Sequence, residues 1–237
     1  MQLSLSSIMF IQTNLLRDYV FPLCVGTQES DEIKFERFLG SGFLIGSHAF
    51  ALTAAHVIDN VQGNIFAMFV GENNKWHAFK ITKSEVHPQE DIAILKLDTA
   101  SLKSIFCLNN AFETQSRDYK QFAYPDDMMY ELNDAGKAIG RPDMIYLQGY
   151  IRRRTNHPIP YMRGTSLFEL SQVGGTGCSG SPIFKITTTN QWRVMGVYVG
   201  ERLNDRGTSV SYAVREDAIR DWSPQILGHS LLVEAGA

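Results

Sequence analysis

From residue 19 to residue 97 the chain is a succession of short apolar runs broken by glycine, proline, asparagine and charged residues. The runs lie at 20–26, 35–38, 42–46, 49–53, 65–70, 76–81 and 92–97. Helical periodicity is almost absent from this stretch, so the pattern predicts an antiparallel barrel or sandwich. Pro22 cannot donate to a central ladder and predicts an edge strand for 20–26. The turn at 71–74 predicts a hairpin between its neighbouring runs.

A second set of apolar runs follows a connector that spans about residues 99–118. These runs lie at 120–124, 144–151, 166–170, 181–186, 193–199 and 209–214. The only helical stripe is Val214, Ala218 and Trp222, with Ile219 and Ile226 beside it, and it predicts a C-terminal helix that covers a barrel. We therefore expect an arm over 1–18, either a short helix or a loose segment, an N-terminal barrel over 19–112 and a C-terminal barrel with its helix over 113–237.

Charge and cysteine content narrow the functional classes. The formal net charge is −3, which argues against nucleic acid as a partner and offers no attraction to anionic membranes. No apolar stretch is long enough to span a bilayer, and the N-terminus lacks a signal-peptide pattern. The three cysteines, Cys24, Cys107 and Cys178, show no metal-ligand spacing. These observations predict a cytoplasmic protein with reduced thiols and without a cofactor or metal.

Three polar residues stand at junctions between predicted strands and loops. His56 ends the run Leu52–His56, Asp91 precedes an apolar strand, and Ser179 lies in the glycine-rich turn 177–182. A serine hydroxyl becomes a nucleophile when a neighbouring base takes its proton, and a third group must hold that base in one tautomer. Histidine, aspartate and serine supply these roles.

Each of these residues also has an ordinary structural explanation. A histidine after a strand commonly caps or faces solvent, an aspartate before a strand commonly sits in a turn, and a serine between glycines commonly belongs to a flexible loop. Their coincidence on an all-β pattern favours the catalytic interpretation.

Three segments together resemble the signature blocks of the chymotrypsin-like serine peptidases. They are Thr53–His56, Asp91–Leu95 and Gly177–Pro182. The sequence is most similar to the bacterial branch that includes glutamyl endopeptidases and the protease domain of HtrA-type enzymes. Phe122–Pro125 and Val194–Tyr198 resemble two further segments of that branch, and the likeness covers roughly residues 20–222.

The resemblance implies an all-β fold of two six-stranded antiparallel barrels with the active site between them. It implies that His56 is the general base, that Asp91 orients it and that Ser179 is the nucleophile. The backbone N–H groups of Gly177 and Ser179 would form the oxyanion hole. The expected activity is that of a serine endopeptidase acting on a protein or peptide.

The chain departs from the family at several positions. Cys178 replaces the aspartate of animal trypsins, so activation by cleavage of a zymogen is not expected, and the reactive position falls on Ser179 rather than Cys178. Gly174 and Tyr198 replace the two residues that bind glutamate in glutamyl endopeptidases. Tyr198, Val199 and Gly200 are the expected substrate-binding residues, with Tyr198 lining the pocket and favouring a small or apolar side chain.

Some features leave alternatives open. The basic cluster of Arg152, Arg153, Arg154, His157 and Arg163 predicts a solvated hairpin or, alternatively, a docking patch for an acidic partner. His87, which precedes a proline, is interpreted as a turn residue. The alternatives to a constitutive enzyme are a protease kept latent until a regulatory partner orders its glycine-rich loop, and a catalytically silent interaction module.

Overall fold

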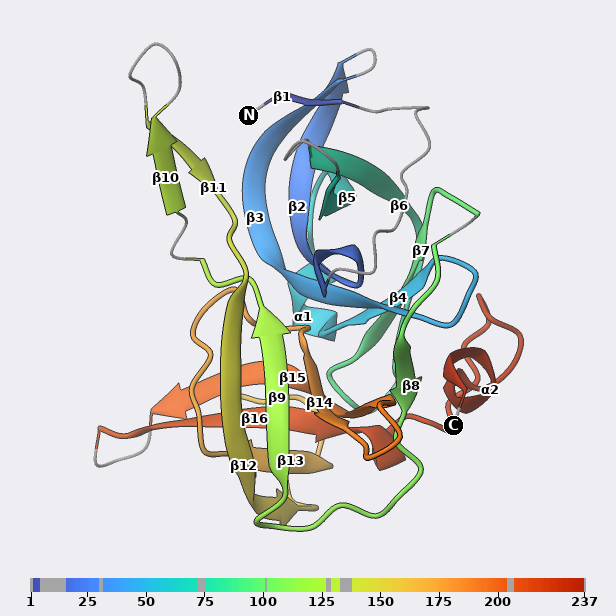
Figure 1. The fold of residues 1–237 in the computed structure, drawn as a ribbon, viewed down its shortest axis with the longest axis vertical. Helices are drawn as coiled ribbons and strands as arrows, with labels where there is room; N and C mark the ends of the chain where they lie inside the picture. The colour runs from blue at the N-terminus through green and yellow to red at the C-terminus, as the bar shows by residue number, and fades with distance from the viewer. Residues whose placement is uncertain are drawn as a thin grey trace.

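A computed structural model of the chain describes residues 2–4, 16–29, 32–71, 76–100, 102–126, 129–132, 138–203 and 207–236. Of residues 2–4, 32, 129–132 and 138–141 it describes only the backbone. The chain forms two closed antiparallel barrels stacked along its longest axis (Figure 1).

The first barrel is a ring of six strands. They are β2 (Val20–Glu29), β3 (Glu32–Ile45), β4 (Phe50–Thr53), β5 (Asn64–Val70), β6 (Trp76–Val86) and β7 (Ala93–Leu97). The ring runs β3-β2-β5-β6-β7-β4 and closes through the β3–β4 pairing. The short strand β1 (Gln2–Ser4) pairs with β3 and, at Ser4, with β6. The predicted hairpin is present, because Val70 of β5 pairs with Trp76 of β6; residues 72–75 of its turn lie outside the described part.

The second barrel repeats this architecture. Its strands are β9 (Asp118–Ala123), β12 (Ile145–Thr155), β13 (Leu167–Leu170), β14 (Pro182–Ile186), β15 (Trp192–Leu203) and β16 (Ser209–Arg215). The ring runs β14-β9-β12-β13-β16-β15 and closes through β14–β15. In β9 the residues Tyr119, Gln121 and Ala123 are buried while their neighbours are not, which is the period-2 pattern of a barrel wall. The two rings confirm the predicted double-barrel fold.

Several short elements complete the chain. Strand β8 (Phe106–Leu108) lies in the predicted connector and runs parallel to β15, while β10 (Met129–Leu132) and β11 (Ala138–Arg141) form a separate hairpin. The helices among the described residues are η1 (Leu16–Asp18), α1 (Ala55–Ile58), η3 (Glu216–Ala218) and α2 (Leu231–Ala235). Among the described helices, none has the length and apolar character that a membrane span needs. All three cysteines are free.

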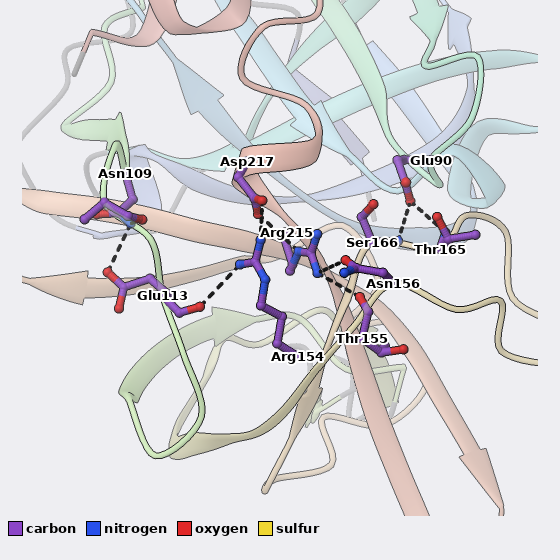
Figure 2. Close-up of polar contacts among 11 residues, drawn as sticks. Glu90, Asn109, Glu113, Arg154, Thr155, Asn156, Thr165, Ser166, Arg215 and Asp217 are labelled. Carbon is purple, nitrogen blue, oxygen red and sulfur yellow. Dashed lines mark hydrogen bonds and ion pairs between the residues drawn. The ribbon is translucent and has the colours of Figure 1, made fainter.

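A hydrophobic core and a set of polar contacts join the two barrels. The largest cluster of buried apolar side chains contains Phe43 and Leu95 of the first barrel together with Phe184 and Val214 of the second. Glu90, just before β7, accepts hydrogen bonds from the backbone N–H groups of Thr165 and Ser166 (Figure 2). The barrels are therefore docked on each other rather than joined only by the connector.

Two local predictions were wrong. Strand β2 is not an edge strand, because it lies between β3 and β5; Pro22 is tolerated since the pairing with β5 begins only at Leu23. The predicted helical stripe is not a helix either: Val214 pairs within β16, and the chain after η3 turns at Pro224. The C-terminal helix is α2, which begins later, at Leu231.

Helix α2 is held against the first barrel by one buried carboxylate. Glu234 is 3% exposed and contacts His48 and His229 at 3.1 Å each, while the backbone N–H of Ser47 donates to it at 3.3 Å. Burial by itself raises the pKa of Glu234, but the hydrogen bonds from these partners outweigh it and lower that pKa. Ser230 caps the helix, because its side chain accepts the N–H of Val233.

Candidate active site

Residues of both barrels line one cleft of about 540 Å³. The first barrel contributes Leu39, His56, Asp59 and Asp91. The second barrel contributes the segments 160–163 and 199–202, together with Gly175, Thr176, Gly177 and Ser179. The fold thus brings His56, Asp91 and Ser179, which are far apart in the sequence, to the same cleft.

The pair His56 and Asp91 is held in one orientation by two hydrogen bonds. Helix α1 follows β4 almost directly and carries His56, whose side chain is 47% exposed, whereas the Asp91 side chain is 9% exposed. His56 Nδ1 lies 2.7 Å from Asp91 Oδ2, and the His56 backbone N–H donates to Asp91 Oδ1 at 3.0 Å. Because a carboxylate only accepts, Nδ1 carries the proton, and Nε2 is left to act as a base.

Ser179 is fixed by backbone hydrogen bonds to both barrels. Its carbonyl accepts the N–H of Ser41 in β3 at 2.8 Å. The next residue, Gly180, donates to the carbonyl of Tyr198 at 2.8 Å, and Tyr198 in turn donates to Ser181 at 2.9 Å. The turn that carries Ser179 is therefore clamped between β3 and β15.

Three consecutive carbonyls before Ser179 accept hydrogen bonds from other parts of the second barrel and from β3. The Thr176 carbonyl accepts from Asp126 N at 2.8 Å, the Gly177 carbonyl accepts from the Ser41 hydroxyl at 3.0 Å, and the Cys178 carbonyl accepts from the Ser181 hydroxyl at 2.7 Å.

In a trans peptide the N–H points opposite to the carbonyl, and the described chain contains no cis bond. The N–H groups of Gly177 and Ser179 consequently point away from these partners. No described residue accepts a hydrogen bond from either of them. Gly177 adopts φ 90°, and an added Cβ would lie 2.6 Å from Asp126 N and from Phe38 Cε1, so the loop conformation requires glycine.

One contact of a closed triad is absent from the described residues. The Ser179 hydroxyl makes no hydrogen bond with the His56 ring, although both line the cleft. In ligand-free enzymes such hydrogen bonds are often long and tighten only when substrate binds.

Cys178 lies beneath the loop rather than in the cleft. It is fully buried, and its thiol donates to the Gly174 carbonyl at 2.9 Å. This contact ties Gly174 to the residue before Ser179. The position agrees with the interpretation of Cys178 as a small buried residue.

The expected substrate-binding residues divide into two groups. Val199 and Gly200 line the cleft, and an added Cβ at Gly200 would lie 3.8 Å from Ser179 Oγ. Tyr198, by contrast, does not line the cleft as expected: it is completely buried, and its hydroxyl accepts the Gly174 N–H at 3.1 Å. Burial raises the pKa of Tyr198, so the phenol remains protonated.

Sequence reasoning missed the cleft wall at residues 160–163. Tyr161 lines the cleft with a fully exposed side chain and a left-handed backbone (φ 68°). Such a conformation is uncommon for a bulky residue and is enriched at binding sites. The sequence did contain a signal for an exposed loop here, because Pro158, Pro160 and Gly164 surround Tyr161.

The arginines of the basic cluster are paired with acidic neighbours. Glu169 contacts both Arg152 and Arg153. Arg154 contacts Asp217, which Arg215 also binds (Figure 2). Arg163 donates to the His87 carbonyl at 2.6 Å.

His87 itself is a buried turn residue. Its ring accepts the N–H groups of Gln89 and Glu90. Burial lowers the pKa of His87.

The sequence matches the family model of the trypsin-like peptidase domain over residues 40–197. No curated protein matches the chain. Among solved structures, the fold is similar to that of the MamO protease domain from Magnetospirillum magneticum in its apo form, with a TM-score of 0.59 and 16% sequence identity. That similarity covers 88% of this chain and 97% of the other, and at this identity it concerns the fold alone.

Proposed function

Since the chain belongs to the trypsin-like peptidase domain family, we propose that it is a serine endopeptidase with Ser179 as its nucleophile. The observation that carries the proposal is the His56–Asp91 pair, hydrogen-bonded at 2.7 Å, facing the same cleft as Ser179. Among the described residues no group of histidine, cysteine, aspartate or glutamate side chains could hold a metal ion. The proposed chemistry uses side chains and backbone amides.

In the proposed reaction, His56 Nε2 takes the proton of Ser179 while Oγ attacks the peptide carbonyl. Asp91 stabilises the imidazolium that forms. The carbonyl oxygen becomes negatively charged and is stabilised by the N–H groups of Gly177 and Ser179. His56 then returns the proton to the leaving amine, and water releases the acyl group by the same steps.

Strand β15 offers a place for the substrate backbone. It pairs with β14 only as far as Val197, whereas it continues along β16 to Leu203. Residues 199–202 of β15 line the cleft, and on the edge opposite β16 no described strand pairs with them. A protein or peptide substrate in extended conformation could add to this edge as a further strand.

One observation favours a second candidate, a protease that a regulatory partner switches on. The Ser179 hydroxyl is not hydrogen-bonded to His56 in the described residues. The hydrogen bonds of the Thr176, Gly177 and Cys178 carbonyls support an oxyanion loop that is already ordered. In this candidate, the partner would adjust the serine side chain and not the loop.

The proposal is tested by digestion of a peptide library, with the cleaved bonds identified by mass spectrometry. We expect cleavage by the wild type and none by Ser179→Ala. Cys178→Ser is the matched control, because a serine hydroxyl can replace the thiol as donor to Gly174; it should retain cleavage. Cleavage by Ser179→Ala equal to that of the wild type would contradict the assignment of the nucleophile.

A further inference from the structure

Asp91 is carried by a short loop between β6 and β7 that is closed by its own hydrogen bonds. The N–H of His87 donates to the carbonyl of Ile92 at 2.8 Å, and the N–H of Ile92 donates to the carbonyl of Glu90 at 2.9 Å. The His87 ring accepts the N–H of Glu90 at 2.9 Å. Because these bonds fix both neighbours of Asp91, a shift of the loop 87–92 takes Asp91 with it.

The second barrel holds this loop at Glu90. That residue is only 4% exposed, and its carboxylate accepts the backbone N–H groups of Thr165 and Ser166 at 3.2 and 3.4 Å (Figure 2). Gly164 adopts φ 89°, and a Cβ added there would lie 2.0 Å from Glu90 Oε2. Glycine at this position therefore lets the backbone of the second barrel lie directly against the carboxylate.

The first residue of the loop, His87, is held in the same way. Arg163 of the second barrel donates to the His87 carbonyl at 2.6 Å. Trp222, which follows the second barrel in the chain, packs edge-on against the His87 ring with 4.9 Å between the ring centroids. Contacts from outside the first barrel thus fix the loop on both sides of the turn that leads to Asp91.

These contacts bear on the alignment of the base with the nucleophile. His56 and Asp91 belong to the first barrel, whereas Ser179 belongs to the second. Both oxygens of Asp91 bond to His56, and no described residue of the second barrel hydrogen-bonds to the Asp91 carboxylate. The second barrel acts on Asp91 through the loop, at Glu90 and His87. Misplacing a catalytic group by about 1 Å can cost about 10²-fold in rate.

We propose that Glu90 is a positioning residue for the proposed reaction: bound by the second barrel, it holds Asp91, and with it His56, in line with Ser179. This inference rests on the proposed function. Without the Glu90 carboxylate, the loop loses its bonds to the second barrel at the residue next to Asp91. The His56 ring then loses the fixed partner that keeps the proton on Nδ1.

The test measures the turnover number and KM of folded Glu90→Ala and Glu90→Gln with a short peptidyl anilide. We expect the turnover number of Glu90→Ala to fall at least ~10-fold. Its KM should change little, because Glu90 does not line the cleft. Glu90→Gln keeps a carbonyl oxygen that can accept the same N–H groups, and it should restore most of the turnover.

A second readout follows the His56 ring in substrate-free protein. The ¹⁵N chemical shifts of its two nitrogens report which of them carries the proton. We expect the proton on Nδ1 in wild type and in Glu90→Gln, and a mixture of tautomers in Glu90→Ala. A role of Glu90 in stability alone would leave these shifts unchanged in the folded variant.

Glu85→Ala is the matched control. The Glu85 carboxylate also accepts a backbone N–H from the part of the chain that follows the second barrel, that of Ile226 at 3.1 Å, but Glu85 lies outside the loop 87–92. This variant should lose stability and keep the turnover number and the His56 tautomer of wild type.

A turnover number of folded Glu90→Ala equal to that of wild type would overturn the inference, and so would an equal loss in Glu85→Ala. If Glu90→Ala does not fold, Arg163→Met takes its place, because it removes the donor to His87; an unchanged His56 tautomer in that variant would overturn the inference. A wild type that neither cleaves the anilide nor reacts with a fluorophosphonate would refute the proposed function. An active wild type with an equally active Glu90→Ala would refute the positioning role alone.

Discussion

At the scale of single residues, Asp91 is the group on which the proposed catalysis depends most. Both of its oxygens are committed to His56, one to the ring and one to the backbone N–H. Replacing Asp91 with asparagine preserves the size and shape of the side chain. However, the asparagine NH₂ group is a donor and cannot accept the hydrogen bond from His56 Nδ1–H. The imidazole would then favour the wrong tautomer.

We therefore expect Asp91→Asn to lower the turnover number by about 10⁴ with little change in stability. The measurement is steady-state hydrolysis of a peptide ester together with thermal unfolding. Asp59→Asn is the matched control, since Asp59 lines the cleft but its carboxylate lies 3.9 Å from Arg163, and this change should alter the turnover number little. A turnover number for Asp91→Asn within tenfold of wild type would contradict the role given to Asp91.

The positions of some residues around the site could be predicted from the sequence, and those of others could not. His56, Asp91 and Ser179 were predicted to share a site, and the fold brings them to one cleft. Tyr198 was misplaced because β15 has an irregularity between Tyr198 and Gly200, which alters the alternation of inward and outward side chains. No rule of strand periodicity reveals such a bulge in advance. The same limit applies to Tyr161, whose position in the cleft wall goes with a left-handed backbone conformation.

At the scale of elements, the turn η3 carries a buried acid without a described hydrogen-bond partner. Glu216 is 1% exposed, and both of its carboxyl oxygens lack a partner among the described residues. Burial, followed by repulsion from Asp217, raises the pKa of Glu216 to about 8. Below pH 4.5 the group is neutral in folded and unfolded chains alike. Between pH 4.5 and about 8 only the unfolded chain ionises, so the folded state loses stability as the pH rises.

Glu216→Gln removes this ionisation. We expect the variant to gain stability relative to wild type as the pH rises through this window, with each unit worth up to about 1.4 kcal/mol and no further gain above about pH 8. Urea unfolding at about pH 5, 7 and 8.5 measures the difference, with Glu29→Gln on the exposed end of β2 as control. A difference that stays constant across these conditions would show that Glu216 does not titrate as described.

Strands were easier to predict than helices in this chain. The burial of β9 alternates as a barrel wall requires, although polar Gln121 points inward and Phe122 is only partly buried. The stripe Val214–Trp222 has helical spacing, yet Val214 completes a ladder with Leu167 and Val197, which a helix would break. Barrel closure therefore outweighed local periodicity. Strand β8 is only three residues long, which is too short for a recognisable strand pattern in the sequence.

At the scale of the whole molecule, the site exists only while the barrels are docked. Glu90 adjoins Asp91 in the first barrel, and its carboxylate is bound by two backbone N–H groups of the second barrel, at 3.2 and 3.4 Å (Figure 2). Arg163 reaches back from the second barrel to the His87 carbonyl. These contacts join the loop that carries Asp91 to the cleft wall at 160–163.

Removing the Glu90 carboxylate should loosen this junction. We expect Glu90→Ala to lower the free energy of unfolding by about 1–3 kcal/mol, because the N–H groups of Thr165 and Ser166 lose their acceptor. Glu90→Gln keeps a carbonyl oxygen in place and should lose less. Urea unfolding of both variants tests this, and equal stability of Glu90→Ala and wild type would show that the contact does not hold the barrels together.

The most direct test of the proposed nucleophile is labelling with a fluorophosphonate, with the modified residue mapped by mass spectrometry. We predict one labelled residue per chain, Ser179, in freshly purified wild type, and no labelling in Ser179→Ala or His56→Ala of confirmed fold. Labelling that appears only after a protein partner is added would select the latent protease. Labelling at another residue, or equal labelling of Ser179→Ala, would show that Ser179 is not the nucleophile.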